Sequence, residues 1–126
     1  MPKIIYPELS YRIIGIAYKI YNNLGYGYQE KYYQKAFSIE FNKQNINYKR
    51  EVCIQLEYSG EKIGKYFIDF IAENKIVIEL KVGSKFYQRD IKQILSYLEN
   101  NKLKLGIIIL ISPPCIKYKR IVNNKI

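Results

Sequence analysis

The stretch Phe67–Lys81, FIDFIAENKIVIELK, holds two runs rich in Ile, Val and Phe that are separated by a short polar segment. Apolar runs of this length, bounded by turn residues, are typical of buried strands, so the stretch predicts a β-hairpin. Asp69 interrupts the first run, and Glu79 and Lys81 interrupt the second. Because an unpaired charge is costly to bury, three such side chains within strands indicate a purpose other than packing.

The length of the hairpin loop decides whether these charges meet. Glu79 and Lys81 are two residues apart in a strand, so their side chains emerge on one face. A two-residue loop would set Asp69 opposite Ile78 and turn it to the other face. A three-residue loop would instead set Asp69 opposite Glu79 and place the two acids together.

Two adjacent carboxylates repel each other unless one is protonated or a cation lies between them. Mg²⁺ suits that position because it takes oxygen ligands, keeps several waters and engages phosphate. A water acidified by the metal can attack phosphorus in line. Lys81 could orient or deprotonate that water, or stabilise the charge that grows on the phosphate oxygens. The alternative is structural, a cross-strand salt bridge between Lys81 and either acid on a solvated sheet edge.

The rest of the chain predicts an α/β fold around this hairpin. Residues 10–24 show helical spacing after Ser10, a suitable N-cap, and residues 51–58 alternate like a half-exposed strand. The order of helices and strands predicts a mixed central sheet flanked by helices, in one domain over residues 1–126. We expect helices at 10–24, 29–44 and 88–101, strands at 51–58, 63–72, 75–82 and 105–111, a turn at 59–62, and a basic tail that can add a last short strand.

The charge of the chain favours a polyanionic partner. It has 21 Lys and Arg against 11 Asp and Glu, a formal net charge of +10. On a small domain this favours a polyanion, most simply nucleic acid. A bias of the whole sequence towards Lys, Ile, Asn and Tyr is the alternative explanation.

Several classes of site are excluded by composition. The chain has no histidine, so a His general base, a Ser-His triad and a His-ligated zinc are all ruled out. Cys53 and Cys115 lack metal-type spacing and are expected as free thiols of a cytoplasmic protein. No apolar run approaches the roughly 20 residues that a membrane span needs, and the first ten residues do not resemble a signal peptide. Catalysis would therefore use carboxylates, lysines, hydroxyls or a metal held by oxygen ligands.

Two motifs resemble a known group of enzymes. Asp69, followed ten residues later by Glu79-Leu80-Lys81, resembles the PD-(D/E)XK nuclease superfamily, whose core has the same order of elements. The segment Gly27–Tyr33, GYQEKYY, fits the GxxExxY pattern that names a family of small proteins within it. The resemblance extends over about residues 10–122, so it covers nearly the whole chain.

The resemblance implies a metal-dependent nuclease that hydrolyses phosphodiester bonds in DNA, or less readily RNA, with Mg²⁺ or Mn²⁺. It implies Asp69 and Glu79 as metal ligands, the Leu80 carbonyl as a third, and Lys81 as the catalytic lysine. Glu30 would be an additional acid near the metal. Its alternative role is that of a helix-start residue favoured by the helix dipole.

Gln93 would approach the site from the third helix, or else be a polar residue at the flank of that helix. Proteins of this family often have His at the positions of Tyr21 and near Asp90, and this chain lacks both. An inactive module that binds nucleic acid or protein on a nuclease fold is therefore the alternative function. A homodimer, or a subunit of a larger defence or repair complex, also stays open.

Overall fold

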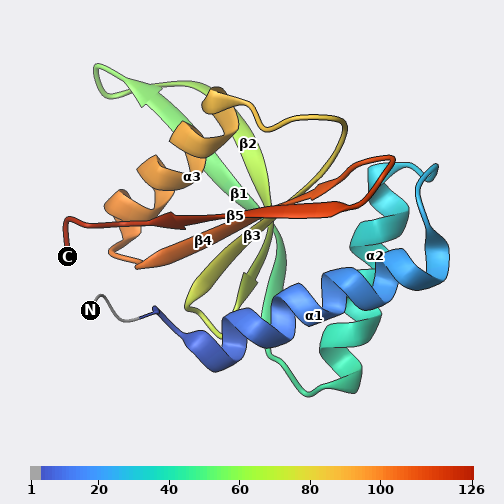
Figure 1. Cartoon of the computed structure of the whole chain (residues 1–126). Helices are drawn as coiled ribbons and strands as arrows, with labels where there is room; N and C mark the ends of the chain where they lie inside the picture. The colour runs from blue at the N-terminus through green and yellow to red at the C-terminus, as the bar shows by residue number, and fades with distance from the viewer. Residues whose placement is uncertain (1–3) are drawn as a thin grey trace.

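The computed structural model describes residues 4–126, which form three helices and one five-stranded sheet (Figure 1). Residues 1–3, the start of the domain expected over 1–126, lie outside the described residues. Among the described helices, none is long and apolar enough to cross a membrane. The elements are α1 (Pro7–Leu24), α2 (Glu30–Lys43), β1 (Tyr48–Tyr58), β2 (Glu61–Ala72), β3 (Ile76–Val82), α3 (Gln88–Asn101), β4 (Leu105–Ile111) and β5 (Ile116–Val122).

The sheet has the strand order β1-β2-β3-β4-β5, so it follows the chain. Neighbouring strands are antiparallel except β3 and β4, which are parallel and joined through α3. The predicted α/β class with a mixed central sheet is confirmed. The basic tail forms β5, which pairs with β4, so β4 is an interior strand. Every residue of β4 is buried, because its two faces belong to the two core layers.

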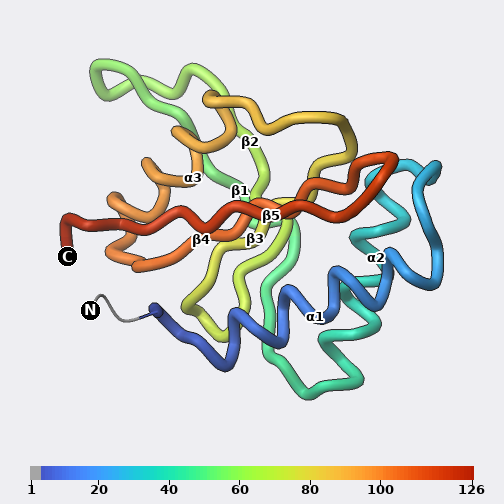
Figure 2. The backbone as a smooth tube through the Cα atoms, in the orientation of Figure 1, coloured from blue at the N-terminus to red at the C-terminus, as the bar shows by residue number. Residues whose placement is uncertain are grey.

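The helices cover the two faces of the sheet in separate layers, α1 and α2 on one face and α3 on the other (Figures 1 and 2). Phe37 and Phe41 of α2 pack with Phe70 of β2 in the first layer. In the second layer, Ile94 of α3 lies so close to β4 that a Cβ atom on Gly106 would be 2.5 Å from its Cγ2. This close approach fixes α3 against the sheet.

Two predicted element boundaries were wrong. The first helix begins at Pro7, with Pro at its first position, and not after Ser10. Ser10 is instead buried within the helix, where its backbone N–H donates to the carbonyl of Tyr6. The strand predicted from residue 51 begins at Tyr48.

The β1–β2 turn is also shorter than predicted. Only Ser59 and Gly60 connect the strands, and β2 begins at Glu61. Both turn residues have positive φ, 51° and 78°, which matches the two-residue turns that suit the twist of a hairpin. The hairpin is therefore longer than the sequence pattern indicated, and it projects past α3 in Figure 1.

Candidate active site

The site lies where β2 and β3 stop pairing. Their backbone pairing runs from Ala72 opposite Ile76 to Phe70 opposite Ile78, which leaves a three-residue loop. The register condition for bringing the acids together is thus met, because the next position sets Asp69 beside Glu79. Asp69 and Glu79 occupy the point at which this stretch of the ladder ends.

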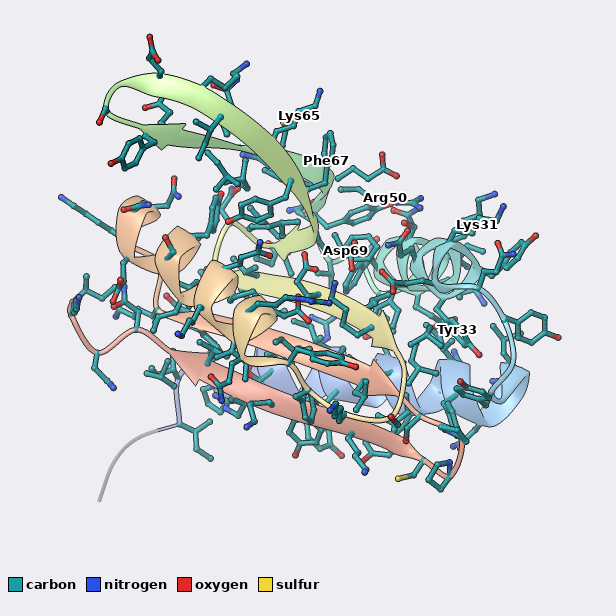
Figure 3. All side chains as sticks on the ribbon, turned by 90° about the horizontal axis from the view of Figure 1, so that it is seen from above. Lys31, Tyr33, Arg50, Lys65, Phe67 and Asp69 are labelled. Carbon is teal, nitrogen blue, oxygen red and sulfur yellow. The ribbon has the colours of Figure 1, made fainter. Side chains whose placement is uncertain are left out.

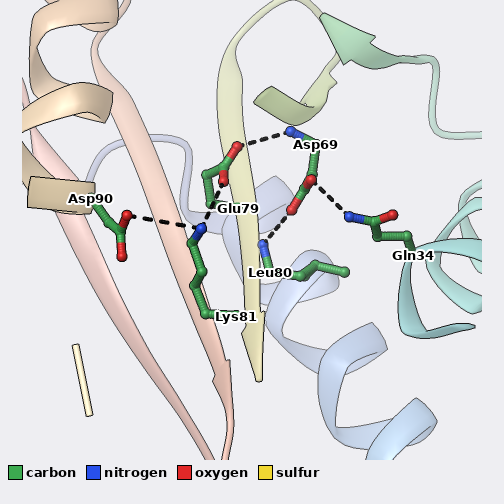
Figure 4. A network of polar contacts seen from close by, with 6 residues as sticks. All are labelled: Gln34, Asp69, Glu79, Leu80, Lys81 and Asp90. Carbon is green, nitrogen blue, oxygen red and sulfur yellow. Dashed lines mark hydrogen bonds and ion pairs between the residues drawn. The ribbon is translucent and has the colours of Figure 1, made fainter. Parts of the chain in front are cut away.

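The two acids accept backbone hydrogen bonds across the gap between the strands (Figure 4). The backbone N–H of Asp69 donates to Glu79 Oε1 at 2.9 Å. The N–H of Leu80 donates to Asp69 Oδ2 at 2.7 Å. The carboxylates therefore satisfy donors that strand pairing leaves free, and in turn these donors fix the position of the carboxylates.

Burial governs the charge of the pair. It raises the pKa of Asp69 to about 6, against the effect of the Leu80 N–H, which stabilises the anion. Burial and the nearby charge of Asp69 raise the pKa of Glu79 to about 8. Near neutral pH the pair consequently carries fewer than two negative charges, and a cation between the carboxylates would favour full ionisation.

Lys81 lies beside Glu79 and faces α3. Its Nζ is 4.0 Å from Glu79 Oε2 and 3.8 Å from Asp90 Oδ1. Asp90 was not predicted as a site residue, although its place three residues before Gln93 on one helix was a usable signal. A small cavity of about 120 Å³ opens here, lined by Tyr66, Phe67, Ile68, Glu79, Lys81, Asp90, Gln93 and Ile94.

Gln93 thus lies at the cavity, as expected, but its side chain is exposed. Gln93 is hydrogen-bonded through its backbone, since the Tyr66 hydroxyl donates to the Gln93 carbonyl at 3.4 Å. Leu80 is buried on the opposite face, and its backbone belongs to the site through the bond to Asp69.

Helix α2 supplies two residues to the site. Glu30, its first residue, is partly buried, which raises its pKa, while the charge of Lys81 and a hydrogen bond with the Val82 backbone lower it. Gln34, one turn later, donates from Nε2 to Asp69 Oδ1 at 2.8 Å. Sequence reasoning missed Gln34, but its i+4 spacing from Glu30 placed both on one face of the helix.

Tyr21, one of the two positions at which the sequence resemblance led us to note an absent His, lies away from these acids. Its hydroxyl is 2.7 Å from the Ser112 carbonyl oxygen and 2.8 Å from that of Pro113. It therefore joins α1 to the loop between β4 and β5.

The donor set fits a hard divalent cation such as Mg²⁺, because the available groups are carboxylate and carbonyl oxygens. Within residues 4–126 no three acids, cysteines or histidines gather into one ligand cluster. A cation at Asp69 and Glu79 would therefore complete its shell with a backbone carbonyl and waters, which is common for Mg²⁺.

The comparisons with known proteins identify the superfamily and the fold. Residues 7–121 match the sequence model of the PD-(D/E)XK nuclease superfamily. No curated protein matches the chain. A solved structure, described as the crystal structure of SSO0001, shares the fold with a TM-score of 0.55 and 24% identity. The match covers 93% of this chain but only 57% of that one, so the chain spans little more than half of its structural neighbour.

Proposed function

Because this chain belongs to the PD-(D/E)XK nuclease superfamily, we propose that it hydrolyses phosphodiester bonds in nucleic acid, with DNA as the favoured substrate, using the charged residues between β2 and β3. The observation that carries the proposal is the pairing of two partly buried acids, Asp69 and Glu79, at the end of a strand ladder beside Lys81. Such a pair is costly in a folded protein unless it binds something.

In this proposal Asp69, Glu79 and the Leu80 carbonyl hold Mg²⁺ or Mn²⁺. When bound, the cation lowers the pKa of a water and offsets charge on the phosphoryl oxygens. Gln34 orients Asp69 through its hydrogen bond, as residues behind metal ligands commonly do.

Lys81 acts on the phosphate side. Its ammonium group, held between Glu79 and Asp90, is placed to donate hydrogen bonds to the non-bridging phosphate oxygens. Glu30 lies close enough to be stabilised by the charge of Lys81, so it helps to position the lysine. Gln93 lies at the wall of the same cavity, and in this proposal it would contact the substrate backbone.

We also propose that the chain belongs to the GxxExxY family, because residues 27–33 fit its pattern. Each fixed residue of the pattern has a separate physical role here. Gly27 has a φ of 123°, which side-chain-bearing residues rarely adopt. Glu30 begins α2 at the site. Tyr33 is fully buried, and its hydroxyl donates to the Gly25 carbonyl at 2.6 Å.

One observation favours a second candidate, a module that binds nucleic acid without cutting it. The acids already accept hydrogen bonds from Asp69 N–H, Leu80 N–H and Gln34, so the network has protein donors without a cation. A binding module would keep the positive surface, which is expected to contact phosphates in a salt-dependent manner.

Cleavage of labelled single-stranded, duplex and branched DNA separates the two candidates. The assay compares Mg²⁺, Mn²⁺ and EDTA for wild type, Glu79→Gln and the control Glu61→Gln, which changes an exposed acid at the start of β2, opposite Tyr58 of β1. Metal-dependent cutting by wild type and Glu61→Gln, but not by Glu79→Gln, supports the nuclease. If all three bind DNA and none cuts, the binding module is the function.

Self-association or membership of a larger defence or repair complex is a separate proposal. Light scattering on the protein with and without DNA tests the homodimer. A monomer in both conditions would contradict it.

A further inference from the structure

An exposed aromatic ring lies at the edge of the candidate site. Phe67 is 51% exposed, although it stands in β2 only two residues before Asp69. It also lines the small cavity that holds Glu79 and Lys81. Exposed apolar side chains are common on protein surfaces, so the exposure alone is not decisive. The place of this ring, at the wall of the cavity that holds the acids, makes its face available to a ligand of the site.

The strand face around Phe67 is uncovered by the protein. Phe67 pairs with Cys53 of β1, and Lys65 pairs with Gln55, and all four are exposed. The other face of this hairpin, with Val52, Ile54 and Tyr66, packs towards α3. The uncovered face is therefore a continuation of the site along β2 and not part of either core.

Positive groups accompany the ring. Lys65 Nζ lies 5.8 Å from the centre of the Phe67 ring. Figure 3 places the labelled Lys65, Phe67, Arg50 and Asp69 in succession along this side of the molecule. Arg50 Nε is buried and makes no hydrogen bond within the described residues, but it lies 3.7 Å from Glu51 Oε1 in an ion pair. A polyanion that crosses this face would meet a cation on each side of the ring.

A second exposed ring stands at the start of α3, the helix whose Asp90 and Gln93 line the cavity. Tyr87, which precedes that helix, is 48% exposed and lies three residues before Asp90. Lys85 Nζ and Arg89 Cζ are 5.2 and 5.1 Å from its ring centre. Aromatic rings combined with basic side chains are the usual means by which proteins bind unpaired strands, since bases stack on the rings while cations follow the phosphates.

We propose that the substrate of this site is single-stranded nucleic acid, and that Phe67 stacks on an unpaired base next to the scissile phosphate while Lys65 binds the neighbouring phosphate. Bases in a duplex already stack on each other and cannot cover the ring. The position of this base next to a cleaved phosphate rests on the proposed nuclease function. The contact of Phe67 with an unpaired base can be measured without cleavage.

The chain has no tryptophan, which permits a direct test of the contact. Phe67→Trp introduces a single indole at the site, and Tyr118→Trp, on β5 at the other edge of the sheet, is the matched control. In EDTA, a single-stranded oligothymidylate is expected to quench Phe67→Trp fluorescence and not that of Tyr118→Trp. A duplex of equal phosphate number, with both ends closed by linkers that carry no bases, is expected to quench neither. Equal quenching by strand and duplex would overturn the proposal.

Affinity provides the second test. Phe67→Leu keeps an apolar side chain without an aromatic face, and Phe67→Tyr keeps the ring. Loss of one stacked base is expected to weaken binding of the single strand by about fivefold or more in Phe67→Leu, with little change for Phe67→Tyr or for the duplex. An equal loss for strand and duplex contradicts stacking. Fluorescence that changes with protein concentration alone would assign the ring to a contact between copies.

The two proposals fail separately. If wild type cuts DNA but Phe67→Leu retains full binding and cutting of single strands, the nuclease stands and the stacking is wrong. If nothing is cut but the single strand still quenches Phe67→Trp, the nuclease is wrong and the strand-binding face stands.

Discussion

The two ends of the β2–β3 pair differ sharply over one residue step. At the loop end, Ala72 pairs with Ile76 and Phe70 with Ile78, and all four side chains are buried and apolar. At the next step the residues are Asp69 and Glu79, and carboxylates accept the hydrogen bonds of the backbone. The loop end stabilises the sheet by burying apolar side chains. The other end lowers the stability of the sheet, because it partly buries two acids whose ionised forms are disfavoured there. The comparison teaches that the site depends on its apolar neighbour for position.

Loss of an acid should separate activity from folding most clearly. We expect Glu79→Gln to lower cleavage by about a thousandfold, since removal of a ligand charge forfeits several kcal/mol of transition-state stabilisation. The fold should persist, because an amide at this position can still accept the bond from Asp69 N–H. Single-turnover cleavage and circular dichroism measure the two effects. Activity close to that of Glu61→Gln would contradict the assignment.

The apolar end should give the reverse result. Phe70 is fully buried between Phe37, Phe41 and Tyr48. Phe70→Ala is expected to lower the free energy of unfolding by about 3–5 kcal/mol through lost burial and a cavity. Urea unfolding checks this value, with Phe67→Ala as the exposed control on the same strand. If Phe70→Ala lost less free energy of unfolding than Phe67→Ala, the apolar end of the β2–β3 pair would not be the part that stabilises the sheet.

A smaller effect on metal binding is expected from Gln34, which contacts one of the acids from α2. Gln34→Ala removes the side-chain donor to Asp69 Oδ1. Metal affinity or activity should fall about 10- to 100-fold, the usual range for a residue behind a metal ligand. Calorimetric titration with Mn²⁺ measures the affinity apart from turnover. Unchanged affinity, with the fold intact, would show that the backbone alone positions Asp69.

The smallest expected effect is on the pH dependence of stability. The pKa of Glu79 rises from 4.5 to about 8, so between these values the folded protein holds more protons than the unfolded chain. Stability should therefore fall as the pH rises through this window. Urea unfolding of wild type and Glu79→Gln in EDTA measures it, and the variant should show a shallower fall. Because binding of a cation requires ionised acids, added Mg²⁺ should stabilise wild type most at the upper end. A parallel slope in the variant would contradict the raised pKa.

Much of the fold could be predicted because hydrophobic periodicity reports burial. The third helix and β4 had the expected bounds, 88–101 and 105–111. The start of β1 could not be found, since Tyr48 to Arg50 carry no alternation of apolar residues. The helix start at Pro7 was missed because Ser10 resembled an N-cap, whereas its side chain is buried by tertiary packing.

The candidate site was predictable only in part. Strand parity limited Asp69 and Glu79 to two arrangements, and the loop length that selects one of them is a property of the fold. Gln34 and Asp90 approach from helices on the two opposite faces of the sheet. Such contacts depend on how helices dock, which local spacing does not specify.

The parallel pairing of β3 with β4 also has a consequence for the order of folding. Ile76 pairs with Leu105, so this contact closes a long loop that includes α3, whereas β1, β2 and β3 are joined by tight turns. Local pairings generally form sooner because they cost less loop-closure entropy. We expect pulse-labelled hydrogen exchange to protect the β1–β3 meander before β4. Asp69 and Glu79 would then meet before the sheet is complete, and Lys81 would gain its partner Asp90 only when α3 docks.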